Sequence, residues 1–240
     1  MPLFAGLRGY AGQLYARAEK LNVENMRAQL ATASPLRDVV DLGCGDGRVT
    51  SEITAGLGIA SVRAVEGYAP YREAAAALGI DAVDADLERT LPFADASFDA
   101  VVSNQVIEHL ADTDRFVTEI GRILRPGGLA VVSTENMASW HNVGALLAGF
   151  QPFSSSNYSR ARYPLGNPFA LHTGMGTTLP DGMLHRRIFT TRALRELFEA
   201  HGFTVVDVRG SGYHPLPAAV GRLDPTHAHF ITIAARKPAT

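Results

Sequence analysis

Residues 39–47 read Val-Val-Asp-Leu-Gly-Cys-Gly-Asp-Gly, and this stretch decides the fold of the 240-residue chain. Two β-branched residues followed by glycine at every second position are typical of a buried strand that enters a tight turn and then a helix. Gly43, Gly45 and Gly47 leave the turn without Cβ atoms, so a ligand can contact main-chain amides directly. The pattern GxGxG is one residue shorter than the dinucleotide-binding fingerprint GxGxxG.

The charges of this turn indicate which ligand it takes. Asp41 and Asp46 place carboxylates beside the glycines, and these would repel a pyrophosphate. S-adenosylmethionine carries no phosphate and presents an ammonium and a sulfonium, which carboxylates attract. The turn therefore favours a cationic adenosine cofactor and disfavours an NAD-dependent oxidoreductase.

Composition narrows the function classes. The chain is 46% hydrophobic and 19% charged with a formal net charge of −2, which gives no general electrostatic reason to bind nucleic acid or an anionic membrane. Cys44 is the single cysteine, so an internal disulfide is excluded and a reducing, cytoplasmic location is expected. The N-terminus does not resemble a signal peptide. No apolar run approaches the roughly 20 residues that a transmembrane helix needs.

Strand-like and helical segments alternate along the first half of the chain. Strands are expected at 38–42, 61–66, 80–83, 97–103 and 129–133, with helices at 47–57, 70–78 and 114–124 and a Pro-Gly-Gly turn at 126–128. This alternation indicates a parallel sheet with helices on both faces. A helix at 191–201, capped by Thr190 or Thr191, and strands at 204–208 and 230–235 follow, and the last two could form a hairpin with an antiparallel strand.

We expect one domain over residues 1–240, in four parts. These are an N-terminal helical segment of one or two helices (1–37), the cofactor-binding core (38–136), an insertion (137–188), and a C-terminal helix with a strand hairpin (189–240). Leu14, Ala18 and Leu21 share one face of the first part. Ligands of open α/β sheets bind outside the carboxyl ends of the strands, where the insertion begins. We therefore interpret the insertion as a substrate lid.

Further candidate cofactor residues follow the expected strands. Glu66 ends the second strand, 23 residues after Gly43, and an acid there can accept both ribose hydroxyls of an adenosine. Asp86 and Leu87 offer a carboxylate beside an apolar wall, which suits adenine. Asn104 stands at the end of the fourth strand, close to where a reacting methyl group would lie.

Five segments together resemble the class I S-adenosylmethionine-dependent methyltransferases of the small-molecule type. They are VVDLGCGDG (39–47), AVEGY (64–68), DADLERTLPF (84–93), SFDAVVSNQVIEHL (97–110) and EIGRILRPGGLAVVS (119–133). The resemblance implies a Rossmann-like α/β fold, with a seven-stranded, mostly parallel sheet whose last strand is antiparallel. It also implies S-adenosylmethionine as the cofactor. By the same resemblance, the pair Glu108-His109 has a mainly structural role or faces the cofactor.

The same resemblance assigns roles in the cofactor site. Gly43 and Gly45 would line the methionine part, and Asp41 would help to hold its ammonium. Glu66 would hold the ribose and Asn104 would offer its backbone. Asp86 and Leu87 would hold the adenine, with Tyr68 over one face of the ring.

His141 is the candidate general base for an alcohol acceptor, which benefits from a group that removes its proton. It lies in the first turn of a helix expected at 139–148, with Ser139 as the N-cap. The positive end of a helix disfavours imidazolium and would keep His141 neutral. Trp140, Val143 and Leu147 would form the apolar face of this helix, so that His141 points elsewhere, toward the cleft.

The remaining candidates surround the acceptor. Glu135, Trp140, Tyr158 and Arg187 are expected to contact it. Alternatively, Glu135, His141 and His185 would assemble a site for magnesium or another divalent metal that lowers the pKa of the acceptor, although their spacing matches no metal motif.

Residues 137–190 carry a second, looser resemblance. ENxxSWHN, LLxGFxPF and HxRxFT resemble bacterial sugar O-methyltransferases of polysaccharide and glycolipid assembly, including methylmannose polysaccharides. This implies a saccharide hydroxyl as acceptor. Alternatives are O-, N- or C-methylation of an aromatic, quinone or polyketide-like metabolite, and a non-catalytic cofactor-binding protein. Nucleic-acid amine methylation is disfavoured, because the fourth strand lacks the Asn-Pro-Pro-aromatic tetrapeptide.

Overall fold

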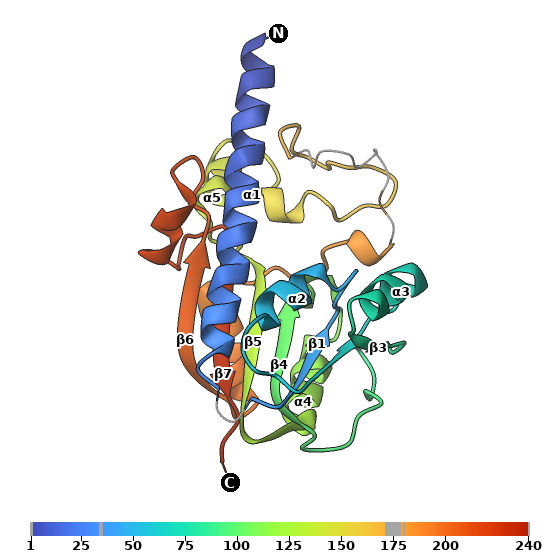
Figure 1. The fold of residues 1–240 in the computed structure, drawn as a ribbon. Helices are drawn as coiled ribbons and strands as arrows, with labels where there is room; N and C mark the ends of the chain where they lie inside the picture. Colours follow the sequence, from blue (N-terminus) through green and yellow to red (C-terminus); the bar gives the residue numbers. More distant parts are fainter. Residues whose placement is uncertain (1, 34–35, 171–178, 180, 240) are drawn as a thin grey trace.

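A seven-stranded sheet organises the chain (Figure 1). The computed structural model describes residues 2–33, 36–170, 179 and 181–239. Within them the strands lie in the order β3-β2-β1-β4-β5-β7-β6. Their bounds are β1 (Asp38–Leu42), β2 (Ser61–Val65), β3 (Asp81–Val83), β4 (Phe98–Asn104), β5 (Leu124–Glu135), β6 (Thr204–Ser211) and β7 (Phe230–Arg236). Strands β1 to β5 pair in parallel, and β7 runs antiparallel to both β5 and β6. The predicted Rossmann-like sheet is confirmed.

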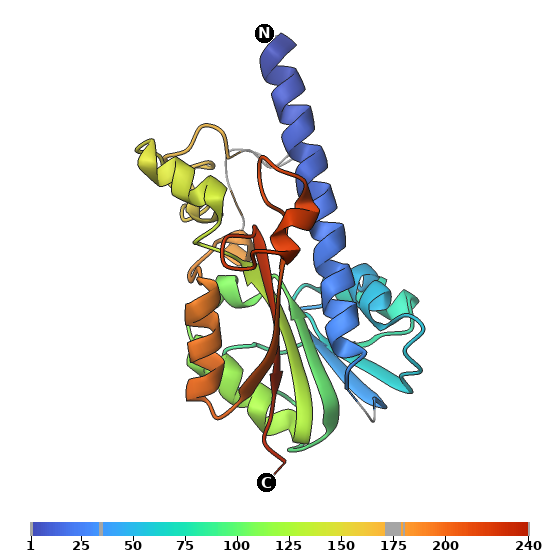
Figure 2. The same cartoon turned by 90° about the vertical axis from the view of Figure 1, so that its left-hand side faces the viewer.

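Helices cover both faces of this sheet, as Figure 2 shows. The α-helices are α1 (Pro2–Leu30), α2 (Arg48–Thr54), α3 (Ala69–Ala77), α4 (Thr113–Ile123), α5 (Trp140–Leu147) and α6 (Thr191–Ala200), and the 3₁₀ helices are η1 (Ile107–His109), η2 (Phe153–Ser155), η3 (Asp181–Met183) and η4 (Ala218–Arg222). Val39 faces α1 and α2, whereas its neighbour Val40 faces α4 and α6. This alternation along each strand gives the sheet two apolar cores.

The N-terminal segment forms one helix, α1, whose first turns project beyond the sheet in both views (Figures 1 and 2). Leu14, Ala18 and Leu21 are buried as expected. Farther along, α1 buries three amide side chains, those of Asn22, Asn25 and Gln29. Their hydrogen bonds hold the helix to the sheet.

Asn22 joins α1 to three strands. Its Nδ2 donates to Oδ1 of Asn104 at 2.8 Å, and its Oδ1 accepts from the hydroxyls of Ser133 and Thr232, each at 2.8 Å. Gln105 adds a bond from Nε2 to the Ser133 hydroxyl at 3.1 Å. Because these groups are largely buried, the bonds replace those that water would otherwise make.

Two expectations about local structure are wrong. Residues 126–128 lie inside β5 and not in a turn before it, because the segment after β7 pairs with them: Gly127 N donates to Pro238 O and Lys237 N to Gly128 O. In α5, Leu147 is 86% exposed, and Asn142 and Ala145 are the buried residues. The side chain of Asn142 determines which face of α5 is buried, because its Nδ2 donates to Asn136 O and Ser154 Oγ.

The described part of the insertion, with α5, η2 and η3, lies at the end of the sheet toward which β1 and β4 point (Figure 1). This is the edge where the glycine turn begins. Among the described residues, no helix has both the length and the apolar character that crossing a membrane requires.

Replacing Asn22 tests the attachment of α1. Asn22→Ala leaves three polar groups without their partner, so we expect the free energy of unfolding to fall by about 2–3 kcal/mol. Glu24→Ala is the matched control on the same helix, because its ion pair with Arg222 is about half exposed and should contribute less than about 1 kcal/mol. Urea denaturation measures both. Equal stability of Asn22→Ala and wild type would show that the network does not hold α1.

Candidate active site

The glycine turn after β1, residues 43–47, exposes main-chain atoms that a ligand can contact. Gly43, Gly45 and Gly47 have φ values of 89°, 55° and 81°, which L side chains rarely adopt. A Cβ on Gly43 would lie 2.5 Å from Cγ2 of Val106, so this position is closed by packing. A Cβ on Gly45 would meet no atom within 4 Å, so this position faces open space where a ligand can approach the backbone.

A cavity of about 280 Å³ opens at this turn. Its lining residues are Asp41, Gly43, Cys44, Gly45, Asp46, Val49, Tyr71 and Asn104. Of the predicted cofactor residues, the structure thus brings Asp41, Gly43, Gly45 and Asn104 together. Val49 and Tyr71 were missed. Each lies in the first turn of a helix that follows a strand of the core, and this position is the signal that could have identified them.

Asp41 is buried at the floor of the cavity. One carboxylate oxygen, Oδ2, accepts a hydrogen bond from the Thr50 hydroxyl at 2.5 Å, and Oδ1 has no partner among the described residues. Burial raises the pKa of Asp41 to about 7, a net result in which the hydrogen bond from Thr50 opposes the shift and the nearby charge of Glu66 adds to it. An uncompensated carboxylate facing a cavity is suited to a cationic ligand group.

Glu66, which directly follows β2, stabilises the glycine turn through hydrogen bonds. Its Oε2 accepts from Gly45 N and its Oε1 from Tyr68 N, both at 2.9 Å. Tyr68 is 59% exposed and packs edge-on against Tyr71, with ring centroids 5.1 Å apart. These two predicted residues therefore adjoin the cavity through Gly45 and Tyr71.

The proposed adenine residues lie in the loop after β3. The Asp86 carboxylate accepts from Glu88 N at 2.9 Å and from Arg89 Nε at 3.2 Å, and Leu87 is partly buried against the core. Neither lines the 280 Å³ cavity, so their contact with adenine stays a prediction.

A second group of polar side chains gathers at the ends of β4 and β5. Glu108 and Glu135 are buried, and the partly buried rings of His109 and His185 lie edge to face with centroids 4.9 Å apart. Glu108 Oε2 accepts from the Thr134 hydroxyl at 2.8 Å. Glu135 Oε2 is 3.8 Å from Nδ1 of His185 and has no hydrogen-bond partner in the described chain.

The backbone explains how residues so distant in sequence meet. The amides of Arg186 and Arg187 both donate to the carbonyl of Glu108, which draws the end of the insertion onto η1. Burial raises the pKa of Glu108 to about 7, and burial together with His185 lowers the pKa of His109 to about 4. The His109 ring is therefore neutral at physiological pH.

His141 belongs to a different group, so the structure does not bring Glu135, His141 and His185 together as one metal site. Its ring packs against those of Phe153, His214 and His229, with centroids 5.4, 5.2 and 4.5 Å away. Burial and then the charge of His214 lower its pKa to about 3. These surroundings, rather than the start of the helix, account for a neutral ring. Ser139 occupies the N-cap position but its side chain makes no capping bond.

The other acceptor candidates lie along the insertion. Trp140 is 46% exposed, its Nε1 donates to the Tyr213 hydroxyl at 2.7 Å, and its ring stacks on His227 with centroids 4.5 Å apart. Tyr158 is 45% exposed. Arg187 donates from Nε and Nη2 to the carbonyl of Ala111, which holds its guanidinium at the loop after η1.

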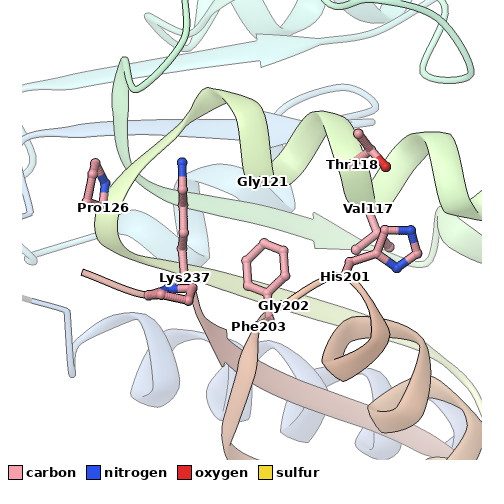
Figure 3. Close-up of a pocket in the computed structure, with 9 residues that line it drawn as sticks. Val117, Thr118, Gly121, Pro126, His201, Gly202, Phe203 and Lys237 are labelled. Atoms are coloured by element: carbon pink, nitrogen blue, oxygen red, sulfur yellow. The ribbon is translucent and has the colours of Figure 1, made fainter. Parts of the chain in front are cut away.

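A larger cleft, of about 390 Å³, lies elsewhere (Figure 3). Its lining includes Val117 and Gly121 of α4, Phe203 after α6, and Pro126 near the start of β5. Because β5 is parallel to β4 and β1, this start is at the opposite end of the sheet from the glycine turn. Lys237, which also lines it, is satisfied by the Leu124 carbonyl at 2.8 Å. The cleft has none of the buried carboxylates that mark the two groups above.

The raised pKa of Asp41 predicts a proton linkage for S-adenosylmethionine, the cofactor expected from the sequence. At pH 6 Asp41 is mostly protonated, and an ammonium beside it favours the ionised form. Binding should therefore release most of one proton at pH 6, and affinity should rise with pH up to about 7 and then level off. Calorimetry in two buffers of different ionisation enthalpy measures the release.

Asp41→Asn should abolish this proton release. Asp46→Asn is the matched control in the same turn, because hydrogen bonding to Arg48 lowers the pKa of Asp46 and leaves it ionised at pH 6. Undiminished release from Asp41→Asn would show that another group carries the linkage.

Comparisons with known proteins identify relatives of this chain. Residues 40–132 match the family model described as a methyltransferase domain. A probable S-adenosylmethionine-dependent methyltransferase of Mycolicibacterium smegmatis is 35% identical over 201 residues, which are 81% of this chain and 62% of that protein. A ubiquinone biosynthesis O-methyltransferase of Rhizobium johnstonii is 29% identical over 203 residues, 80% of this chain and 71% of that protein. The match spans less than two thirds of the length of the Mycolicibacterium smegmatis protein, and 39% of the length of two probable S-adenosylmethionine-dependent methyltransferases of Mycobacterium tuberculosis.

Solved structures show the same fold. An S-adenosylmethionine-dependent methyltransferase from Mesorhizobium loti superposes with a TM-score of 0.60 at 22% identity, covering 93% of this chain and 100% of that one. The residues present fit S-adenosylmethionine, since Asp41 has an unpaired buried oxygen and Gly45 faces open space. Sheet order, glycine turn and sequence matches together show that this chain contains a methyltransferase domain of the class I S-adenosylmethionine-dependent type.

Proposed function

We propose that this chain transfers a methyl group from S-adenosylmethionine to a hydroxyl oxygen of a small-molecule acceptor, a sugar hydroxyl of an oligosaccharide or glycolipid. The observation that carries the proposal is the buried carboxylate of Glu135, whose Oε2 lacks a hydrogen-bond partner among the described residues. It ends β5, next to the strand whose last residue, Asn104, lines the cofactor cavity. An acceptor hydroxyl there would donate to this oxygen.

The chemistry requires such a group. The cofactor supplies a methyl group on a positively charged sulfur. A hydroxyl is a weak nucleophile, so its proton must leave as the new C–O bond forms and the C–S bond breaks, with the electron pair of that bond remaining on sulfur. Glu135 would accept the proton at Oε2 and hold the oxygen in line, and positioning of this kind is a large part of the rate enhancement.

His141, the base expected from the sequence, is the alternative proton acceptor. With its pKa lowered to about 3, it holds a proton weakly and is poorly matched to neutral pH. Its ring packs among those of Phe153, His214 and His229, and its Nε2 lies 3.4 Å from the Ser139 hydroxyl. We therefore favour Glu135 over His141.

The exposed aromatic side chains of the insertion support a saccharide. Trp140 is fixed by its hydrogen bond to Tyr213 and its stacking on His227, which leaves part of a rigid ring available. Aromatic faces of this kind bind the apolar faces of sugar rings. We propose that residues 137–188 act as the acceptor lid, with Tyr158 and Arg187 contributing contacts, and that the enzyme works in the cytoplasm, in keeping with a single free cysteine.

A phenol or quinol is the second candidate acceptor. The relative from Rhizobium johnstonii is named as a ubiquinone biosynthesis O-methyltransferase, and a planar ring would stack on Trp140 equally well. Transfer of labelled methyl to a panel of sugars, quinols and phenols distinguishes the two, since the proposal expects turnover of saccharides.

Glu135→Gln tests the proton acceptor. It removes the base while keeping the shape of the side chain, so kcat should fall by about 10²–10⁴-fold with an unchanged cofactor affinity. His141→Ala is the comparison, with an expected loss of less than about tenfold. A larger loss in His141→Ala than in Glu135→Gln would reverse the assignment.

Trp140→Ala tests the aromatic platform. The acceptor KM should rise about tenfold, because one stacking contact of roughly 1 kcal/mol or more is lost, and the cofactor affinity should not change. Leu147→Ala, on the same helix and 86% exposed, is the control and should behave as wild type. An unchanged KM in Trp140→Ala would place the acceptor elsewhere.

A further inference from the structure

We propose that Glu108, His109 and His185 bind a divalent transition-metal ion. One ligand atom from each side chain lies within 4.8 Å of the others. Across the described residues, this is the one group of three or more His, Cys, Asp or Glu side chains that meets this spacing. Two of them come from η1 and one from the end of the insertion, so the site forms only in the folded chain.

Both imidazoles are held in the tautomer that metal binding needs. Nδ1 of His109 is 3.1 Å from the Leu184 carbonyl, and Nδ1 of His185 is 2.6 Å from the Ser154 carbonyl. A carbonyl oxygen only accepts, so each Nδ1 carries the hydrogen and each Nε2 keeps its lone pair. Protein metal sites orient their histidines through such backbone hydrogen bonds.

The carboxylates complete the site. Glu108 is oriented by the Thr134 hydroxyl, and the unpaired, buried Oε2 of Glu135 lies 3.8 Å from Nδ1 of His185. Among the described residues no Lys or Arg side chain pairs with either buried carboxylate, so a divalent cation would supply positive charge there. The unpaired oxygen of Glu135 is a second observation, independent of the spacing, that points to a ligand here.

The ligand set indicates the class of metal. Two imidazoles and one carboxylate suit Zn²⁺ or Co²⁺, whereas Mg²⁺ and Ca²⁺ prefer oxygen ligands alone. In the tetrahedral arrangement that Zn²⁺ favours, ligand atoms lie about 2.0–2.2 Å from the ion, so neighbouring ligand atoms are roughly 3.4 Å apart. Small side-chain movements would therefore close the site, and three ligands would leave a position open for the acceptor oxygen.

The consequence for catalysis rests on the proposed function. An ion in this position would lower the pKa of an acceptor hydroxyl whose proton Glu135 then takes. Metal binding itself needs neither the acceptor nor the methyl donor, so it can be tested separately.

The test is titration of the chelator-treated, full-length chain with Zn²⁺ by calorimetry and with Co²⁺ by visible absorption. We expect one ion per chain. His185→Gln and His109→Gln should each weaken binding by at least about 100-fold, with the Co²⁺ spectrum lost. Circular dichroism and cofactor affinity verify that each variant is folded, because the cofactor binds in the separate glycine-turn cavity. If one histidine variant does not fold, Glu108→Gln replaces it as the test of the metal site.

His201→Gln is the matched control. His201 also bonds through Nδ1 to a backbone carbonyl, that of Leu197, and lies 3.5 Å from the carboxylate of Asp114, but no second imidazole packs against its ring among the described residues. It should bind as wild type. Absence of saturable binding at one ion per chain would overturn the site, and so would wild-type affinity in His109→Gln and His185→Gln. Failure of every acceptor to be methylated would count against the proposed function and leave the binding result intact.

Discussion

The carboxamide of Asn22 is the constraint on which the active edge of this protein depends. One side chain from the N-terminal helix satisfies Asn104 at the end of β4, Ser133 in β5 and Thr232 in β7. Its partners belong to parallel and antiparallel parts of the sheet at once, so the helix can dock in only one position. Since Asn104 also lines the cofactor cavity, the same bonds that fix α1 fix one wall of the site.

Three carboxylates are buried at the same end of the sheet. Asp41, Glu108 and Glu135 lie at or just after the ends of β1, β4 and β5, and the pKa values of the first two are raised to about 7 by burial. Burying these groups without a cation is unfavourable. Folded proteins usually keep such unfavourable groups where a ligand compensates for them. This reasoning supports the two proposed sites for positive charge, the cofactor site at the glycine turn and the metal site at the ends of β4 and β5.

The local pattern of the sequence was enough to predict the sheet and the cofactor turn, because strand periodicity and glycine spacing act over a few residues. Contacts between residues distant in sequence determine the features that the local pattern did not predict, namely the docking of α1 and the surroundings of His141. Asn22 and Thr232 are 210 residues apart, and nothing near either one indicates the other. His141 was expected to face a cleft, but its surroundings come from His214 and His229, which lie beyond α6 in a loop without a recognisable pattern. The prediction of the apolar face of α5 was wrong for the same reason. A contact distant in sequence, between the Asn142 amide and Ser154, decides which face of the helix is buried.

The placement of His185 links the insertion to the chemistry. The amides of Arg186 and Arg187 fix the end of the insertion on Glu108, while the carbonyl of Ser154, in η2, holds the His185 ring. Ser154 is in turn bonded to Asn142 of α5, and the adjacent Trp140 offers its exposed ring. A chain of contacts therefore runs from the aromatic surface to an imidazole beside Glu135. Under the proposed function, an acceptor that shifts η2 on binding would change the hydrogen bond from His185 to Ser154, and this would couple acceptor recognition to the geometry of the proposed reacting groups.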